Sequence, residues 1–365
     1  MRTLIVCSSP YTVFNAINYA MGTDEQVDIL IFINTETMKK IYQELLKNNI
    51  FHYCFCCADF NFSKSFMLKS VIACILPHLF FRRKLCRLED VYEKIISQNF
   101  YFATLVYRIC KKATFYLIED GLGSYVYRVS EAGKRNKYML WVHKYIFLGG
   151  LIPDISGQYI YHPEMVEYTP NRAPGLKLNC SAFNKVDIIK RIFSYKESGE
   201  VIKSKCVVFG DSMMSECFYV DSLGNRINKY SFLNKYIFSK ISKENIIYRP
   251  HPFEKDYSAY IEGKIDNTRN MWELDSLYNI TDNNVLINYY STAVVTPKLM
   301  FDKEPYILFL FSFIDYYNDK YEDFSLFIDK IRKLYRAPDK ICIAKTIDDI
   351  DCFFKGINNK HDMVQ

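Results

Sequence analysis

Residues 114–125 read Thr-Phe-Tyr-Leu-Ile-Glu-Asp-Gly-Leu-Gly-Ser-Tyr, and this stretch decides the fold. Five apolar or β-favouring residues run directly into two carboxylates, Glu119 and Asp120, and then into a glycine-rich turn. A short apolar run bounded by a breaker is typical of a buried strand. Open sheets of parallel strands bind ligands at the carboxyl ends of the strands. We therefore predict that residues 114–118 form such a strand, with Glu119 and Asp120 at the ligand edge.

The residues before this stretch alternate between strand and helix patterns. Residues 2–7, 27–33 and 51–57 are apolar runs typical of strands, and helical spacing covers residues 13–21 and 36–46. Strands that alternate with helices predict a parallel sheet with helices on both faces. The expected fold class of this half is therefore α/β, with a doubly wound sheet.

The turn after the first strand is another candidate ligand edge. Ser9 and Thr12 lie there, beside Ser8 and Pro10. Their hydroxyls could hydrogen-bond a substrate, which makes both residues candidates for the acceptor side of a site. Capping of the following helix is the other role that these residue types take at this position. The sequence leaves both roles open.

The strand pattern restarts after an irregular region, residues 168–204, which we interpret as the connection between two domains. Apolar runs typical of strands follow at residues 205–209, 246–248, 285–287 and 305–313. The first three end in polar or glycine turns, which predicts a second α/β sheet with its own pocket at the carboxyl edge. A chain of 365 residues is long enough for two domains with sizeable cores. We expect them to span residues 1–200 and 201–365.

Composition and charge narrow the class of protein. Half of the residues are apolar and a quarter are charged, as in a globular protein. The formal net charge of +6 favours anionic partners such as nucleotides or acidic lipid, but it is too small to indicate nucleic-acid binding. The twelve cysteines lack the spacing of a disulfide framework. Cys54, Cys56 and Cys57 cluster after His52, so a zinc site is an alternative, but no second Cys-x-x-Cys pair completes it, and reduced thiols in the cytoplasm are favoured. Asp349 and Asp351 are spaced like metal ligands but lie in a helical pattern, where a solvated face is expected.

Membrane association stays open at the level of sequence. We expect no signal peptide, and no apolar run reaches the ~18 residues that a spanning helix needs. Residues 71–81 are almost wholly apolar, however, and Arg82, Arg83 and Lys84 follow at once. Such a stretch suits the interface of an anionic membrane, here the inner face of the cell membrane. A buried helix with a solvated basic end is the alternative.

A histidine in the second half is a candidate phosphate ligand. His251 lies between Pro250 and Pro252, directly after a predicted strand, and Arg249 precedes them. Two prolines fix two φ angles, so the loop is stiff. A stiff loop suits a group that must bind or protonate a phosphate, and Arg249 adds positive charge there. A plain surface histidine is the alternative.

Two hydroxyl residues follow another predicted strand. Ser291 and Thr292 come shortly after residues 285–287 and are expected to start a helix. A helix N-terminus with two hydroxyls suits a phosphate group, although simple capping would use the same residues. An activated nucleotide donor would need these features together with a base for the acceptor hydroxyl.

Three short motifs carry a resemblance to a known enzyme class. Glu119-Asp120-Gly121, His251-Pro252 and Ser291-Thr292 resemble, in this order, the motifs of bacterial sialyltransferases. Residues 4–16 and the run Arg249-Pro250-His251-Pro252 are similar to glycosyltransferase family 52, the lipooligosaccharide and capsule sialyltransferases.

This resemblance implies a GT-B fold, in which two Rossmann-like parallel-sheet domains face a cleft. It also implies an inverting transfer of sialic acid from CMP-sialic acid to a hydroxyl of a galactoside or sialoside, without a metal or another cofactor. Residues 1–200 would bind the acceptor and carry the catalytic base. Residues 201–365 would bind the nucleotide sugar, with the last helix free to pack back on the first domain.

The resemblance also implies roles for individual residues. Glu119 would be the general base, and Asp120 and Gly121 would support the loop. His251 would contact the donor phosphate, with the option of acting as general acid. The remaining residues implied on the donor side are Ser291, Thr292, Arg249, Gly210 and Glu273.

Two other functions stay open. One is a GT-B glycosyltransferase with another donor, either a different CMP-nonulosonate or a UDP-hexose. The other is a catalytically inactive protein that binds glycan or scaffolds a capsule assembly complex. A homodimer is compatible with each of these functions.

Overall fold

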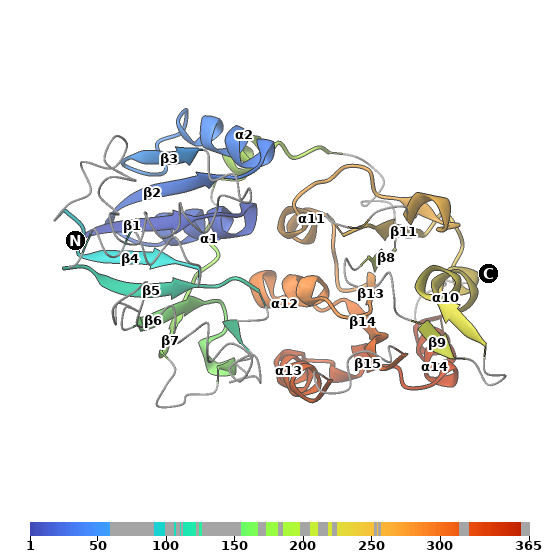
Figure 1. The fold of residues 1–365 in the computed structure, drawn as a ribbon. Coiled ribbons are helices and arrows are strands. Elements are labelled where there is room, and N and C mark those ends of the chain that lie inside the picture. The colour runs from blue at the N-terminus through green and yellow to red at the C-terminus, as the bar shows by residue number, and fades with distance from the viewer. Residues whose placement is uncertain are drawn as a thin grey trace, which may run out of the picture. The chain divides into compact units, whose positions relative to one another are not determined.

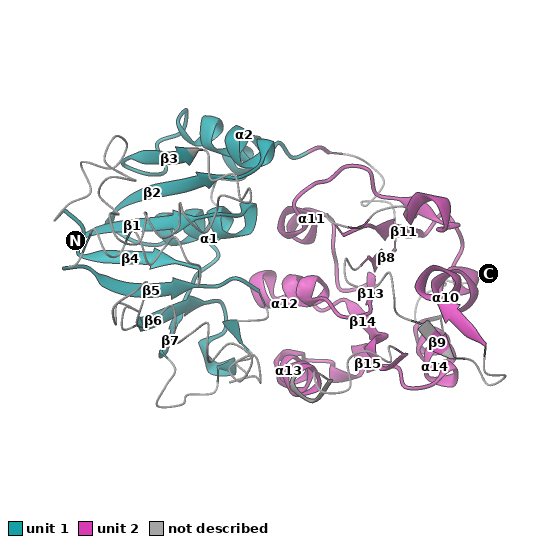
Figure 2. Cartoon of the chain, in the orientation of Figure 1, with its two compact units in different colours: residues 1–195 teal, residues 196–365 magenta. Residues whose placement is uncertain are grey.

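The chain forms two compact units, Met1–Tyr195 and Lys196–Gln365 (Figures 1 and 2). The computed structural model describes residues 1–58, 91–98, 106, 110, 112–121, 124–125, 155–166, 173–181, 185–197, 205–210, 218–220, 225–251, 254, 257–313 and 321–358. The boundary expected from the sequence, after residue 200, lies close to the division between the units.

The first unit contains a sheet of seven parallel strands in the order β3-β2-β1-β4-β5-β6-β7 (Figure 1). The strands are β1 (Arg2–Cys7), β2 (Gln26–Ile33), β3 (Cys54–Ala58), β4 (Lys94–Ser97), β5 (Thr114–Ile118), β6 (Ile155–Ile160) and β7 (Gly175–Lys177). The described helices are α1 (Pro10–Met21), α2 (Glu36–Leu45) and α8 (Val186–Ile192). The parallel α/β fold predicted from alternating patterns is confirmed for this unit.

Local chemistry explains where these elements begin. β1 is buried from Thr3 to Cys7, as expected for a central parallel strand covered on both faces. α1 begins at Pro10, three residues before its helical spacing suggests, because Ser9 caps it and proline suits the first helical position. β4 has no clear signal in the sequence. The sequence pattern predicts an irregular connection over residues 168–204, but this region contains β7 and α8, which is a correction to that prediction.

The second unit contains a sheet of six parallel strands in the order β12-β11-β8-β13-β14-β15. The strands are β8 (Cys206–Phe209), β11 (Ile246–Arg249), β12 (Lys264–Ile265), β13 (Val285–Asn288), β14 (Tyr306–Phe309) and β15 (Ile341–Ile343). The described helices are α10 (Lys229–Tyr236), α11 (Trp272–Tyr278), α12 (Thr296–Phe301), α13 (Tyr321–Leu334) and α14 (Ile347–Asn358). A separate antiparallel pair joins β9 (Phe218–Val220) to β10 (Arg226–Asn228).

Short 3-10 helices complete the described structure. They are η3 (Pro163–Met165), η5 (Phe238–Lys240), η6 (Tyr257–Ala259), η7 (Thr292–Val295), η8 (Phe311–Phe313) and η10 (Pro338–Lys340). The structure thus confirms a mixed α/β chain with two parallel sheets, compatible with two Rossmann-like domains.

Both sheets have a point at which the strand order reverses. In the first unit, β1 lies between β2 and β4, and in the second unit, β8 lies between β11 and β13. When the strands of each sheet are counted in sequence, the second sheet has the order 3-2-1-4-5-6, and the first has the same order with a seventh strand added beside the sixth. Doubly wound sheets with this order bind ligands outside the carboxyl ends of the strands beside the reversal. The expected ligand edges are therefore formed by the segments after β1 and β4 in the first sheet and after β8 and β13 in the second.

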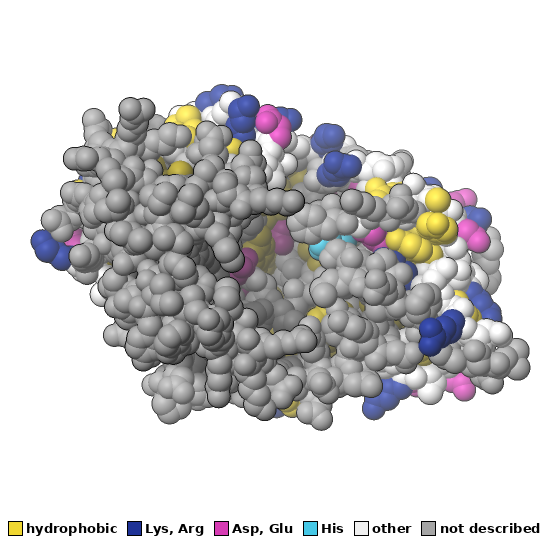
Figure 3. Space-filling view, viewed as in Figure 1, with side chains coloured by type: hydrophobic (Ala, Val, Ile, Leu, Met, Phe, Trp, Pro, Cys, Tyr) yellow, Lys and Arg dark blue, Asp and Glu magenta, His cyan; other side chains and the backbone are white. Residues whose placement is uncertain are grey.

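Membrane binding would need two features, an apolar helix and a basic surface. Within the ranges described, no helix combines the length and apolar character that crossing a bilayer requires. The apolar stretch 71–81 and the basic residues Arg82, Arg83 and Lys84 lie outside the described residues. On the face shown in Figure 3, Lys and Arg side chains of the described residues form separate small groups rather than one continuous patch.

Candidate functional site

Glu119 lies at the carboxyl end of β5 and is enclosed by hydrogen-bond donors. Its side chain is only 2% exposed. The Oε1 atom accepts a hydrogen bond from the Tyr11 hydroxyl at 2.8 Å. The Oε2 atom accepts one from the Tyr125 hydroxyl at 2.5 Å and one from the Tyr161 backbone N–H at 3.0 Å. Both carboxylate oxygens are therefore engaged by residues of α1, of the turn after β5 and of the segment after β6.

Two buried asparagines of α1 hold this arrangement in place. The Asn15 side-chain amide donates to the Glu119 carbonyl at 2.9 Å. The Tyr161 hydroxyl donates to Asn15 Oδ1 at 2.6 Å and accepts a hydrogen bond from the Asn18 amide at 3.0 Å. Fully satisfied buried polar networks are rigid. The end of β5 is thus tied to α1 through Asn15 and to the segment after β6 through Tyr161.

Asp120 has the opposite environment. Its side chain is exposed, and no hydrogen bond to its carboxylate from another described residue is seen. Its backbone N–H donates to Ser124 Oγ at 2.9 Å, and the Ser124 N–H donates to the Gly121 carbonyl at 3.0 Å. Gly121 has φ 80°, a left-handed conformation that favours glycine. This tight turn directs the Asp120 carboxylate outward while Glu119 stays inside.

Burial raises the pKa of both acids. Desolvation raises the pKa of Glu119 to about 7, although hydrogen bonds from Tyr125, Tyr161 and Tyr11 act in the opposite direction. Desolvation by surrounding protein atoms also raises the pKa of Asp120 to about 6, despite its exposed surface. Carboxylates with a pKa near neutrality suit proton transfer at neutral pH.

The raised pKa of Glu119 predicts that the free energy of unfolding depends on pH. Glu119 has a pKa of about 7 in the folded chain and an ordinary value of 4.5. The folded state therefore binds this proton more tightly, and the associated stability is complete below pH 4.5 and lost as the pH rises through 7. We expect the free energy of unfolding of the wild type to fall by roughly 3 kcal/mol relative to Glu119→Gln over this interval.

Urea unfolding of both proteins at several pH values between 4.5 and 8 measures this difference. Glutamine has nearly the same shape and does not titrate, so its stability lacks the proton linkage, and any cost of exchanging one acceptor oxygen for an NH₂ group is the same at every pH. Parallel stability curves would show that Glu119 titrates alike in the folded and unfolded chains.

The hydroxyls of Ser9 and Thr12 form a capping box for α1. Ser9 Oγ accepts the Thr12 N–H at 3.2 Å, and Thr12 Oγ1 accepts the Ser9 N–H at 3.2 Å. Thr12 is fully buried, whereas Ser9 is half-buried. Of the two expected acceptor-side residues, Thr12 is occupied by the cap, and Ser9 alone retains exposed surface.

In the second unit, three predicted site residues follow three neighbouring strands. Gly210 follows β8, His251 comes two residues after β11, and Ser291 comes three residues after β13. Because β8 lies between β11 and β13 in a parallel sheet, their carboxyl ends share one edge. This edge includes the point at which the strand order reverses, where ligands bind in this class of fold.

The turn that carries His251 is closed by Glu254. The Glu254 N–H donates to the His251 carbonyl at 2.9 Å, and the His251 N–H donates to Glu254 Oε2 at 3.2 Å. Glu254 Oε1 accepts from Lys229 Nζ at 2.5 Å and from the hydroxyls of Tyr230 and Tyr248 at 2.9 and 2.8 Å. His251 itself is half-buried, and Pro252 lies outside the described residues.

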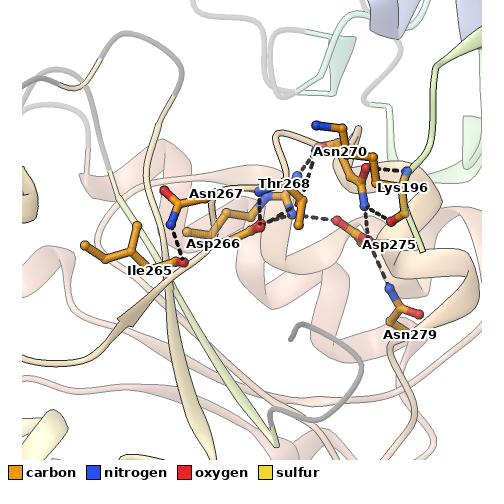
Figure 4. A network of polar contacts seen from close by, with 9 residues as sticks. Lys196, Ile265, Asp266, Asn267, Thr268, Asn270, Asp275 and Asn279 are labelled. Carbon is orange, nitrogen blue, oxygen red and sulfur yellow. Dashed lines mark hydrogen bonds and ion pairs between the residues drawn. The ribbon is translucent and has the colours of Figure 1, made fainter. Parts of the chain in front are cut away.

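Arg249 is held by acidic groups rather than directed to an open edge. Its Nη1 atom lies 2.7 Å from Asp266 Oδ2 and 2.6 Å from Asp275 Oδ2, and both carboxylates are buried. Its Nη2 atom donates to the Asn270 carbonyl. Figure 4 shows this part of the molecule, with the Asp275 carboxylate directed toward the amides of Asn270 and Asn279. The expected role of Arg249 as a phosphate ligand therefore has less support than a structural role.

Trp272 connects this cluster to the segment after β13. The Arg249 guanidinium lies over the Trp272 ring, 5.3 Å from its centroid. The Trp272 indole N–H donates to the Ala293 carbonyl at 2.6 Å. Glu273, the next residue, is half-buried in the first turn of α11. Trp272 thus links the Arg249 cluster to η7, the short helix that Ser291 precedes.

Ser291 caps the short helix η7. Its Oγ atom accepts the Ala293 N–H at 3.2 Å, and its carbonyl accepts a hydrogen bond from the Asn288 side-chain amide. Thr292 is the first residue of η7 and is half-buried. Capping uses one of the two lone pairs of the Ser291 hydroxyl, so its proton stays available for donation to a ligand.

Several residues of the hydrogen-bond networks around Glu119 and His251 cannot be predicted from the sequence. Tyr11, Tyr125 and Tyr161 surround Glu119, but tyrosines are so frequent in this chain that none stands out. Glu254 gives one weak signal, an acid three residues after a histidine in a proline loop. As to metals, the residues described contain no group of three His, Cys, Asp or Glu side chains arranged to hold an ion.

Comparisons with known proteins do not identify the chain. No protein-family model matches it, and no curated protein sequence is significantly similar to it. The resemblance to sialyltransferases thus depends on the three motifs, their order and their positions at strand ends.

Proposed function

We propose that the chain is an inverting sialyltransferase of the GT-B type, which uses a CMP-activated sialic acid and a glycan hydroxyl as acceptor. The observation that carries the proposal is the position of the motifs. Each follows a strand of a parallel doubly wound sheet, and Gly210, His251 and Ser291 follow three neighbouring strands of one sheet. Such edges bind nucleotides in many α/β proteins.

In the proposed reaction, the acceptor hydroxyl attacks the anomeric carbon of the sialic acid from the face opposite the phosphate. The new carbon–oxygen bond forms as the bond to the CMP oxygen breaks, which inverts the configuration. The hydroxyl proton passes to a carboxylate, and the electron pair of the broken bond leaves with CMP. His251 and the hydroxyls of Ser291 and Thr292 stabilise the phosphate charge by hydrogen bonding or protonation.

We assign the base to Asp120 rather than Glu119, which exchanges the roles implied by the sequence motif. Asp120 is exposed and near neutral in pKa, so a bound hydroxyl can reach it. Glu119 has both oxygens engaged by Tyr11, Tyr125 and Tyr161 and is 2% exposed. A general base must come within hydrogen-bond reach of its proton, which favours the exposed acid. Glu119 then orients the loop.

Incubation of the full chain with CMP-sialic acid and a panel of galactosides and sialosides tests the proposal. We expect mass spectrometry to show acceptors enlarged by one or more sialic acids, also in excess EDTA, with His251→Ala as the inactive control. A thermal-shift series with CMP, UMP and UDP runs beside it. Stabilisation by UDP alone would favour a UDP-hexose donor, and no response to any nucleotide would favour an inactive glycan-binding or scaffold protein.

A further inference from the structure

We propose that Glu254 is a positioning residue that holds His251 at the carboxyl edge of the second sheet. This inference rests on the proposed function, because it assumes that His251 contacts the donor phosphate. Glu254 does not belong to the three motifs. Its two carboxylate oxygens have different partners, and this division of partners carries the argument.

One oxygen of Glu254 is an anchor. Three donors converge on Oε1: the ammonium of Lys229 at 2.5 Å and the hydroxyls of Tyr230 and Tyr248 at 2.9 and 2.8 Å. Lys229 and Tyr230 belong to the first turn of α10, and Tyr248 belongs to β11. Because the side chains of Lys229 and Glu254 are only 5% and 3% exposed, the ion pair is shielded from water. Three donors on one oxygen leave the carboxylate little freedom to rotate.

The other oxygen of Glu254 binds the backbone of His251. Oε2 accepts the His251 N–H at 3.2 Å, while the Glu254 N–H donates to the His251 carbonyl at 2.9 Å. The two residues are thus bonded in both directions across one turn, and Pro250 restricts φ directly before it. The anchored carboxylate therefore fixes the backbone from which the imidazole extends.

Gly210 provides the space for this carboxylate. A Cβ atom at Gly210 would lie 2.0 Å from Glu254 Oε2 and 2.6 Å from the Tyr248 hydroxyl oxygen. Neither distance is compatible with a real Cβ contact, so any side chain at Gly210 must displace the carboxylate. The glycine at the end of β8 is thus required by Glu254, whether or not it also lines a nucleotide pocket.

The substitution Glu254→Gln distinguishes the roles of the two carboxylate oxygens. A glutamine has one acceptor oxygen and one NH₂ group. The Lys229 ammonium requires the oxygen, which turns the NH₂ toward the His251 N–H and sets two donors against each other. Tyr230→Phe is the matched control, because it removes one donor from Oε1 and keeps the ring that stacks on Tyr260.

Amide NMR of protein labelled with ¹⁵N-histidine is the direct test. The chain has six histidines, and His251→Asn identifies the signal of residue 251 by its loss. We expect the His251 amide signal to move in Glu254→Gln and in Gly210→Ala, while the other histidines and the Tyr230→Phe spectrum stay unchanged. An unmoved His251 signal in both variants overturns the proposal. If Glu254→Gln does not fold, the His251 amide signal of Gly210→Ala by itself decides whether the proposal holds.

A double-mutant cycle on CMP affinity tests the functional consequence. Glu254→Gln should weaken CMP binding by roughly tenfold, the equivalent of one hydrogen bond. It should have no further effect in the His251→Ala background, because it acts through His251. Additive effects would overturn the positioning role and leave Glu254 a structural residue. If the wild type binds no CMP, the proposed function fails, and the amide signal still decides the role of Glu254.

Discussion

Replacement of Asp120 by asparagine is expected to lower transfer by roughly 10²–10⁴-fold, the range for loss of a general base. Asparagine has nearly the same shape but cannot take the acceptor proton. Glu119→Gln is expected to have the smaller effect, because the buried side chain of Glu119 orients the loop through Tyr11, Tyr125 and Tyr161. CMP affinity should change little in either variant, since both residues belong to the first unit.

Single-turnover transfer at saturating donor, measured for both variants from pH 5 to 8, distinguishes the two acids. Burial raises the pKa of Asp120 to about 6, so the wild-type rate should rise with pH as this carboxyl loses its proton. Glu119→Gln should keep that rise, and Asp120→Asn should lose it. If instead Glu119→Gln is the inactive protein, the base is the first acid of the motif, as its resemblance to sialyltransferases implies.

Replacement of Arg249 by methionine is expected to lower the free energy of unfolding by about 3–5 kcal/mol, the range for breaking a buried ion pair. The change leaves the buried carboxylates of Asp266 and Asp275 without their cation. It also removes the guanidinium that lies over Trp272. Chemical denaturation measures the loss. Arg249→Lys should recover only part of it, because arginine reaches the two acids through Nη1 and the Asn270 carbonyl through Nη2, whereas a lysine has a single nitrogen on a differently shaped side chain.

Lys47→Met serves as the control for this prediction. Lys47 pairs with Glu44 at 2.5 Å, but its side chain is 67% exposed, so its removal should cost less than about 1 kcal/mol. If Arg249→Met instead keeps the wild-type free energy of unfolding and loses CMP affinity, Arg249 is a phosphate ligand and not a structural residue.

Most of the fold could be predicted because its signals are local. The apolar runs at residues 2–7, 114–118 and 205–209 contain the strands β1, β5 and β8. β1 and β8 are buried almost throughout, as their continuous hydrophobicity indicated, whereas in β5 only Phe115 and Ile118 are buried. β4 and β7 were missed because they are only four and three residues long. Periodicity cannot be recognised in so few residues, and these strands are stabilised mainly by pairing with neighbours that are distant in sequence.

The candidate site could be predicted only in part. The motif residues Asp120, His251 and Ser291 were found because each is a polar residue just after an apolar run. Glu254 and the tyrosines around Glu119 were not found, because a hydrogen bond between residues 108 positions apart, such as that from Tyr11 to Glu119, leaves no trace in local spacing.

By itself, the sequence determined that this chain has two α/β halves and that acids, a histidine and hydroxyls follow particular strands. Those properties depend on hydrophobic pattern and chain order, which short windows contain. Only the tertiary structure decided that Glu119 is enclosed while Asp120 is exposed, and that Arg249 is neutralised by two buried acids. The physical reason is that burial and ion pairing depend on which distant segments the fold brings together, and these set the pKa and the reach of each side chain.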